Sequence, residues 1–317
     1  MALDLGTFLA IYGAVMDGDL TSWSIGGPPP SSLLSTVGLL GQPQGISGSH
    51  NKYESDASPT RGDLYKDGND YLLRLPQFQE LYAMQAGVSD ADSNFGLGLL
   101  TDFRAKRFQQ SIDGNPYFYN GPFTGVVVQP AAYTFIYRFF ANHSAANPDG
   151  QLTKSVLKSF FAISGPDNSL KYTPGWERIP NNWYRRSLTD EYTIPYFNSD
   201  LLSQAAQHPQ FLSVGGNTGT TNSFAGVDIT DLTGGVYNSE SLTQGNNAAC
   251  FGFQAAVQMA PDKLSGLFTN ITPALNMLTS ALGPIASSLG CPQLQAIDKA
   301  QFDKYPGYTK MKANGQY

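Results

Sequence analysis

A short acidic stretch in the first quarter of the chain carries the residue types that bind metal ions. Glu54-Ser55-Asp56-Ala57-Ser58 places two carboxylates and two hydroxyls in five consecutive positions. A hard cation such as Mg²⁺ or Mn²⁺ prefers several oxygen ligands close together, and a carboxylate, a backbone carbonyl and a hydroxyl supply them. The stretch therefore predicts a metal site. The same residues also fit a helix start, with Ser58 as N-cap and Pro59 in the first helical position.

A second group of charged residues lies on a helix predicted from Asp92 to Asp113. Apolar residues recur along it at helical spacing, and Gly114-Asn115-Pro116 is typical of a helix end. Its charged residues include Arg104, Lys106, Arg107 and Asp113. From the residues alone, Arg107 either pairs with Asp113 or solvates a surface face.

The chain has two cysteines, Cys250 and Cys291, which lie 41 positions apart. In an oxidising compartment two cysteines most simply form one disulfide. In the chain-entropy description, a loop of this length would stabilise the fold by roughly 4 kcal/mol.

Composition limits the classes of protein that this chain can be. Its 317 residues suffice for a sizeable core, either as one large domain or as two lobes, and 41% of them are hydrophobic. Charged residues are only 14%, and the surface rich in Ser, Thr, Asn and Gln is common among secreted proteins. The net charge of −6 favours neither nucleic acid nor an anionic membrane as a partner. No apolar run reaches the roughly 18 residues of a membrane span.

The remaining segments predict mostly helices joined by loops. Helices are expected at residues 3–15, 70–85 and 152–161, and loops at residues 23–44 and 174–186. The aromatic run at residues 117–140 is expected to be core. The Trp and Arg residues of the 174–186 loop suit cation–π contacts or stacking, and a structural role is preferred. No glycine pattern of a phosphate-binding loop occurs, so a nucleotide site is not expected.

Glu54-Ser55-Asp56-Ala57-Ser58 resembles the Glu-His/Gly-Asp-x-Ser element of the fungal haem-thiolate peroxidases, the chloroperoxidase and unspecific peroxygenase family. Residues 174–186, 211–219 and 231–235 also resemble segments of long fungal members. The resemblance implies a mainly α-helical, single haem haloperoxidase/peroxygenase-like domain over residues 1–317. It also implies haem b, with Mg²⁺ or Mn²⁺ held beside a haem propionate by Glu54, the carbonyl of Ser55 and the hydroxyl of Ser58. Position 55 departs from the family pattern, since it is neither His nor Gly.

The family resemblance also implies an activity and a compartment. Peroxidases of this family oxidise small organic substrates with hydrogen peroxide, and an acid near an Arg moves the proton. Asp113 and Arg107 are the nearest match to that pair. Relatives are secreted and have a C-terminal disulfide placed similarly to Cys250–Cys291. An extracellular location is therefore expected, and the sequons at Asn142 and Asn270 become candidate glycosylation sites.

The proximal haem ligand of the family, a Cys in a Pro-Cys-Pro turn before the acidic element, has no counterpart in this sequence. Cys291-Pro292 is rejected as a substitute because it lies at the wrong end of the chain and follows Gly290. None of the three histidines is placed to replace the ligand, and His50 belongs with the metal-side element. The first segment, with any signal peptide, is therefore expected to be missing upstream of Met1. The alternative is a secreted, non-catalytic member that has lost haem and acts as a scaffold or ligand-binding protein.

Overall fold

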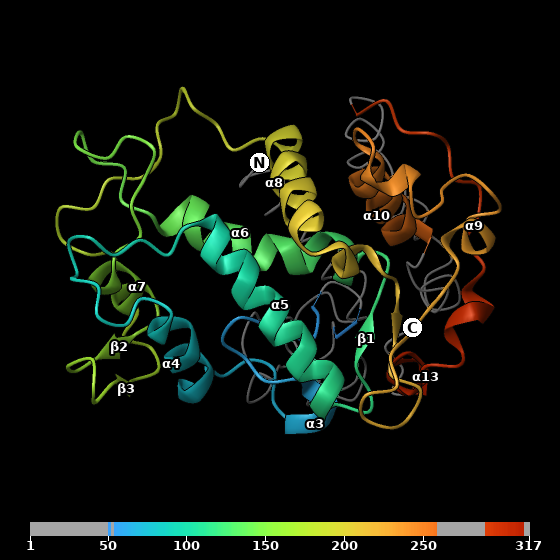
Figure 1. The fold of residues 1–317 in the computed structure, drawn as a ribbon, viewed down its shortest axis with the longest axis horizontal. Coiled ribbons are helices and arrows are strands. Elements are labelled where there is room, and N and C mark those ends of the chain that lie inside the picture. Colours follow the sequence, from blue (N-terminus) through green and yellow to red (C-terminus); the bar gives the residue numbers. More distant parts are fainter. Residues whose placement is uncertain (1–49, 52–53, 259–288, 314–317) are drawn as a thin grey trace, which may run out of the picture.

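The structure, a computed structural model, describes residues 50–51, 54–258 and 289–313 (Figure 1). These residues are mainly helical, as the sequence predicts. The longer helices are α4 (Leu75–Ala83), α5 (Leu97–Gly114), α6 (Gln129–Phe140), α7 (Lys154–Phe160), α8 (Ile194–Gln207), α10 (Asn247–Gln258) and α13 (Pro306–Ala313). The helix and loop predicted at residues 3–15 and 23–44 and the sequon at Asn270 lie outside the described residues.

Short elements connect these helices. They are the α-helical turns α3 (Leu64–Asp67) and α9 (Ile229–Leu232), the π-helix η2 (Thr124–Val128), and the 3₁₀ turns η3 (Pro209–Leu212), η4 (Ser241–Thr243) and η5 (Lys299–Phe302). Two small antiparallel sheets complete the fold. One has the order β1 (Tyr119–Asn120), β4 (Gly215–Gly216), β5 (Ala225–Gly226), and the other pairs β2 (Ile163–Ser164) with β3 (Lys171–Tyr172).

The helix predicted at residues 70–85 is shorter than expected, because α4 begins only at Leu75. The side chain of Asn69 accepts hydrogen bonds from the backbone N–H groups of Tyr71 and Leu72, which folds these residues into a turn. Arg74 N–H then donates to the Thr60 carbonyl at 2.8 Å. The backbone groups that would begin the predicted helix are thus used elsewhere, and Pro76 falls in the first turn, where proline is tolerated.

The helices predicted at residues 92–113 and 152–161 also begin late, for a shared reason. Phe95 N–H donates to the Leu152 carbonyl, and Leu152 N–H donates to the Asn94 side chain. This pairing keeps both segments extended until α5 starts at Leu97 and α7 starts after its N-cap Thr153. At the other end, the glycine expected beyond the helix is its last residue, Gly114.

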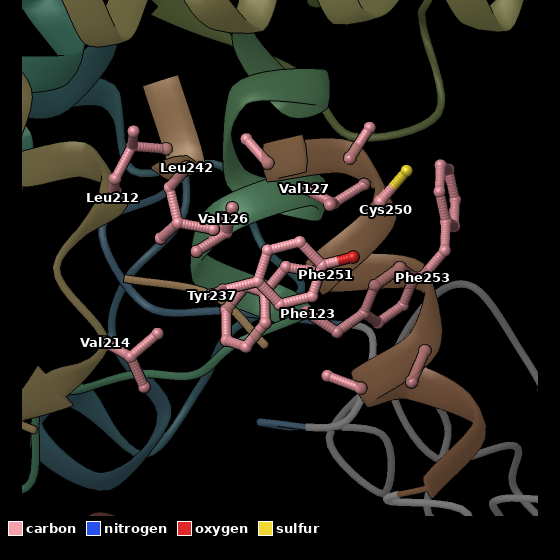
Figure 2. Close-up of a cluster of buried hydrophobic side chains, with 14 of the residues drawn as sticks. Phe123, Val126, Val127, Leu212, Val214, Tyr237, Leu242, Cys250, Phe251 and Phe253 are labelled. Atoms are coloured by element: carbon pink, nitrogen blue, oxygen red, sulfur yellow. The ribbon is translucent and has the colours of Figure 1, made fainter. Parts of the chain in front are cut away.

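The largest hydrophobic cluster is built around the π-helix η2 and α10. Figure 2 shows Phe123, Val126 and Val127 grouped with side chains of α10, among them Phe253, whose ring centroid lies 6.2 Å from that of Phe123. A Cβ atom added at Gly252 would lie 2.2 Å from Val127 Cγ2, so the missing side chain permits the close approach. The aromatic run at residues 117–140 therefore supplies core, as the sequence predicts.

A disulfide joins Cys250 of α10 to Cys291, with 5.4 Å between the two Cα atoms. The predicted pairing of the two cysteines is thus confirmed. Cys250 is completely buried, and its helix packs on the π-helix, so the bridge ties the C-terminal segment to the main hydrophobic cluster.

The predicted loop at residues 174–186 contains no helix or strand. Trp183 donates from its indole N–H to the Phe140 carbonyl at 2.8 Å and meets the Phe160 ring edge-on. Trp176, in contrast, is 68% exposed. Trp183 therefore has the structural role that was preferred, and the described residues contain no Trp–Arg cation–π pair in this loop.

None of the helices in the described ranges combines the length and the apolar character needed to cross a membrane.

Candidate functional site

The acidic loop, defined here as residues 54–60, is buried along its whole length. Ala57 has φ of 58°, a left-handed conformation that is uncommon for a residue with a side chain. The turn at Ala57 lets its N–H donate to Asp63 Oδ1 at 3.0 Å. The interpretation of this stretch as a helix start is wrong, because the next helix, α3, begins at Leu64 with Asp63 as its N-cap residue.

Three consecutive backbone carbonyls of the acidic loop accept hydrogen bonds from side chains of α5 and α6. The Asp56 carbonyl accepts from Gln129 Nε2 at 3.0 Å and the Ala57 carbonyl accepts from the Tyr133 hydroxyl at 2.7 Å. The Ser58 carbonyl accepts from Arg107 Nε at 3.1 Å. The helices therefore hold the loop through its backbone, which leaves its side chains available for other contacts.

Four ionisable side chains converge beside this loop. His50 Nδ1 lies 2.5 Å from Glu54 Oε2 and 3.7 Å from Asp70 Oδ2, while His50 Nε2 lies 3.3 Å from Asp56 Oδ1. The candidate ligand atoms of His50, Glu54 and Asp70 all lie within 4.8 Å of one another. All four side chains are at most 4% exposed. The arrangement is a buried His–carboxylate cluster whose donor atoms are of the types that hold metal ions.

The surroundings of the cluster disfavour the ionised form of its carboxyl groups. Burial raises the pKa of Glu54 well above its ordinary value, and the negative charge of Asp70 raises it further. Burial likewise raises the pKa of Asp56, and the negative charge of Asp63 raises it further, while His50 lowers it. A divalent cation would compensate these negative charges.

Several polar atoms of the cluster have no hydrogen-bond partner within the described part of the chain. They are both amide atoms of Asn51, Glu54 Oε1 and Ser55 Oγ, together with His50 Nε2 and Asp56 Oδ1, which face each other at 3.3 Å without a hydrogen bond. Buried polar atoms are nearly always satisfied by protein, water or an ion. So many unsatisfied atoms in one place indicate a site that takes up a polar ligand or a cation.

The predicted metal ligands lie in one turn but have different surroundings. The Glu54 carboxylate faces His50, and Ser55 is buried. The Ser58 hydroxyl accepts hydrogen bonds from the backbone N–H and the Nε of Arg61, at 3.3 and 3.4 Å. The structure thus brings the three predicted residues together, with the Ser58 hydroxyl beside a guanidinium group.

The predicted catalytic residues Arg107 and Asp113 share α5 but have different environments. Arg107 is buried and donates to the Ser58 carbonyl and to Gln110 Oε1. Asp113 is exposed and accepts a 2.7 Å hydrogen bond from Gln109. Among the described residues the two form no ion pair with each other, although both line a surface depression of about 380 Å³.

Arg104, one turn before Arg107, is a second cation that supports the acidic loop. It is 1% exposed and donates to Gln129 Oε1 at 3.0 Å, to Gln204 Oε1 at 2.8 Å and to the Gly125 carbonyl at 3.2 Å. No carboxylate of the described chain pairs with it, and burial lowers the pKa of its guanidinium to about 9. Because Gln129 also donates to the acidic loop, Arg104 fixes the amide that holds the loop.

His50, Asp56 and Asp70 are site residues that the predicted ligand set does not contain. One signal in the sequence points to His50, which precedes Glu54 by four positions within the metal-side element. Asp70 lies sixteen positions after Glu54 in a segment predicted to be helical, so only the tertiary fold brings the two together.

Comparison with known proteins identifies the family. The sequence profile described as "Peroxidase, family 2" matches residues 1–188. The chain is 42% identical over 313 residues to the dothistromin biosynthesis peroxidase dotB of Dothistroma septosporum, covering 98% of this chain and 73% of that protein. It is 40% identical over 321 residues to the aromatic peroxidase fscJ of Fusarium equiseti, covering 97% of this chain and 72% of that protein.

A more distant relative is the aromatic peroxygenase of Cyclocybe aegerita, which is 29% identical over 232 residues, 70% of this chain and 52% of that protein. The profile covers more than half of the chain and includes the whole acidic loop. The chain therefore belongs to peroxidase family 2, the fungal haem-thiolate peroxidases, and is an enzyme of the peroxidase or peroxygenase type.

Proposed function

We propose that the protein oxidises small aromatic molecules with hydrogen peroxide and that haem b is its cofactor. The observation that carries this proposal is the buried acidic loop, which keeps the Glu-x-Asp-x-Ser pattern of the family and has unsatisfied polar atoms. The relatives named as an aromatic peroxidase and an aromatic peroxygenase support an aromatic substrate.

The residues of the chain fit the propionate side of such a haem site. They do not supply a cysteine thiolate as the ligand of the iron. Bound haem supplies the redox chemistry that activates peroxide. The acidic loop suits a Mg²⁺ or Mn²⁺ ion beside a propionate, with Glu54, the Ser55 carbonyl and Ser58 as proposed ligands. Cys250 and Cys291 are joined in a disulfide, so neither offers a thiolate to an iron.

Proton transfer is assigned to Asp113, with Arg107 as its cationic neighbour. Asp113 is solvent-exposed at the end of α5, where it can exchange protons with water. Arg107 is held in place by the Ser58 carbonyl, and both residues line the same depression. A carboxylate that carries a proton between the two oxygens of a peroxide needs this combination of access and nearby positive charge.

The proposal is tested by adding haem to the purified protein. Haem uptake is followed by its absorption spectrum, and oxidation of a phenolic substrate is measured with and without peroxide. In the 317-residue chain we expect little haem binding and no turnover, because neither cysteine offers a thiolate. An upstream extension that supplies a Pro-Cys-Pro turn should bring saturable haem binding and peroxide-dependent turnover, and their absence in the extended protein would instead support the non-catalytic alternative.

A matched pair of variants tests the cation part of the proposal. Glu54→Gln should reduce bound metal and bound haem together, because the ion neutralises a propionate. Glu80→Gln, which removes a carboxylate that pairs with Lys106 on the surface, should leave both unchanged. If Glu54→Gln binds as much metal and haem as the wild-type protein, the cation binds elsewhere.

We also propose that the protein is secreted and glycosylated. A structural disulfide is typical of proteins from oxidising compartments. Treatment of the natively produced protein with an N-glycosidase should increase its electrophoretic mobility, and Asn142→Gln should remove part of that shift. Native protein that is found only inside cells and does not shift would contradict both statements.

A further inference from the structure

We infer that the β3–α8 connection, residues 173–193, binds the surface of an anionic lipid membrane. The inference goes beyond the proposed function, because it concerns a surface that the oxidation chemistry does not use. The connection contains no helix or strand, and it follows the left and upper edge of the molecule in Figure 1, away from α10 and α13. Connections of this length without secondary structure are uncommon in compact domains and usually have a function.

The first support is the set of large apolar side chains that the β3–α8 connection exposes. Trp176, Ile179, Tyr184 and Leu188 are 58–72% exposed. No other large hydrophobic residue of the described chain is more than 46% exposed. Single exposed apolar residues are common on protein surfaces, but a concentration of them in one segment marks an interaction surface.

The second support is that hydrogen bonds to the backbone hold these side chains outward. Ser159 of α7 accepts from Arg178 N–H through its carbonyl at 3.1 Å and donates from its hydroxyl to the Arg178 carbonyl at 2.8 Å. Further along, His143 N–H donates to the Tyr184 carbonyl, and Tyr184 N–H donates to the Asn142 side chain, both at 2.8 Å. The fold therefore fixes the position of the connection and the exposure of its apolar side chains.

The third support is the local charge. The sequence from Trp176 to Leu188 contains three arginines and one carboxylate, whereas the chain as a whole has a net charge of −6. Arg178 and Arg185 are exposed, and neither forms an ion pair within the described chain. Salt screens charges that lie more than about 8 Å apart at physiological ionic strength, so the arginines dominate the field at a surface that they touch. Their excess suits anionic lipid headgroups.

A lipid surface fits this combination better than a protein partner does. Trp and Tyr rings prefer the boundary between headgroups and acyl chains, and segments that lie in this boundary combine them with aliphatic and basic residues. A protein interface requires a continuous, closely packed apolar core. Here the apolar side chains alternate with polar ones along a connection without regular structure, and a fluid surface accommodates that arrangement.

Co-sedimentation with lipid vesicles tests the inference. The protein is mixed with vesicles of phosphatidylcholine alone and with vesicles of phosphatidylcholine and phosphatidylserine in equal amounts. We expect stronger binding to the vesicles that contain phosphatidylserine, and we expect added salt to weaken it. Binding to neither kind of vesicle, or equal binding to both, would overturn the inference without any variant.

Tryptophan fluorescence locates the contact. Phosphatidylcholine that is brominated on its acyl chains quenches only those indole rings that reach the chains. The fluorescence of the wild-type protein should fall on binding, and Trp176→Ser should remove this fall although Trp23 and Trp183 remain. Quenching that persists in Trp176→Ser would contradict the assignment.

Matched variants separate the apolar part of the contact from the charged part. Trp176→Ser and Ile179→Ser should each weaken binding by at least about tenfold, since each removes a large side chain that would leave water. Arg178→Gln/Arg185→Gln should weaken it by about 25-fold, about fivefold for each arginine.

The controls make the same chemical changes outside the connection. Leu72→Ser removes another exposed apolar side chain, and Lys304→Gln removes an exposed positive charge next to α13. Both should bind vesicles as the wild-type protein does, and circular dichroism confirms that every variant is folded. Losses in the controls as large as those in the connection would contradict the inference.

Size-exclusion chromatography with light scattering tests for a second copy of the chain as the occupant. We expect the wild-type protein to be monomeric at the concentration used with vesicles. A dimer that Trp176→Ser dissociates would show that another protomer covers the connection, and it would overturn the inference. None of these measurements uses haem or turnover, so their outcome is independent of the proposed function.

Discussion

Arg107 Nε donates a 3.1 Å hydrogen bond to the backbone carbonyl of Ser58, which joins the centre of α5 to the acidic loop. Both partners are buried, so water does not replace this contact when it is lost. Arg107→Met should therefore lower the free energy of unfolding by about 2–3 kcal/mol, the value of a hydrogen bond from a charged group. Urea unfolding followed by circular dichroism measures the change.

Lys106→Met is the control for this variant. Lys106 is the neighbouring residue of α5, and its ion pair with Glu80 is half-exposed. Exposed pairs contribute at most about 1 kcal/mol. Equal losses in the two variants would show that Arg107 does not hold the loop.

Tyr133→Phe should destabilise the protein by about 1–2 kcal/mol. The substitution removes one hydroxyl from a fully buried ring and leaves the Ala57 carbonyl without its 2.7 Å donor. Tyr184→Phe makes the same chemical change on a ring that is 58% exposed, and its effect should be within about 0.5 kcal/mol. Thermal unfolding of both variants measures the two changes in stability. A Tyr133→Phe variant as stable as the wild-type protein would contradict the prediction.

The stability of the metal-free protein should fall as the pH rises above about 4. Burial raises the pKa of Glu54 and of Asp56, so the folded chain keeps protons that the unfolded chain loses near its ordinary carboxyl pKa of about 4. The folded state then binds more protons than the unfolded state, and its stability declines with pH until the raised pKa is passed. Melting temperatures measured from pH 4 to pH 8 with a chelator should show this decline.

Saturating Mn²⁺ should reverse the trend, because the ion replaces the protons on the carboxylates. Glu54→Gln should flatten the pH dependence in the chelator, and Glu240→Gln, at an exposed position, should leave it unchanged. A pH profile that is the same with Mn²⁺ and with the chelator would show that the cluster does not bind the ion.

Removing the disulfide should cost about 4 kcal/mol of stability. The bridge closes 41 positions, and the chain-entropy description gives that value for a loop of this size. The double variant Cys250→Ser/Cys291→Ser and the wild-type protein in reductant should lose similar amounts in denaturant titrations. A loss below about 1 kcal/mol in both would show that the bridge is not a main support of the fold.

In the haem-loaded protein that carries an upstream Pro-Cys-Pro segment, Asp113→Asn should lower peroxidase turnover by at least about 100-fold, because the variant cannot carry a proton. Asp102→Asn, another exposed carboxylate of α5, should retain turnover. Haem uptake should be equal in both variants. Full turnover in Asp113→Asn would remove it as the acid.

The sequence predicts those parts of the site that are local in the chain. Glu54, Ser55 and Ser58 lie within five positions, so their proximity in space follows from any compact turn. The cysteine pairing follows because the chain offers a single choice. Helix interiors are also predictable, since the periodicity of their apolar residues reflects the face that is buried.

The missed features depend on partners that are distant in the chain. The start of α5 is delayed because Phe95 pairs with Leu152, which lies 57 positions away. Asp70 reaches the cluster only because the turn at Asn69 replaces the start of the predicted helix. Such competition between local propensity and tertiary hydrogen bonds is decided by the whole fold.

The three carbonyls of the acidic loop have a consequence for the order of folding. Their donors lie 49, 73 and 76 positions further along the chain. During synthesis the loop leaves the ribosome well before Arg107, Gln129 and Tyr133 do, and it cannot adopt its final turn until α5 and α6 have packed. Uptake of the proposed ion would thus be a late event in the maturation of the protein, and a nascent chain would gain nothing from meeting the metal early.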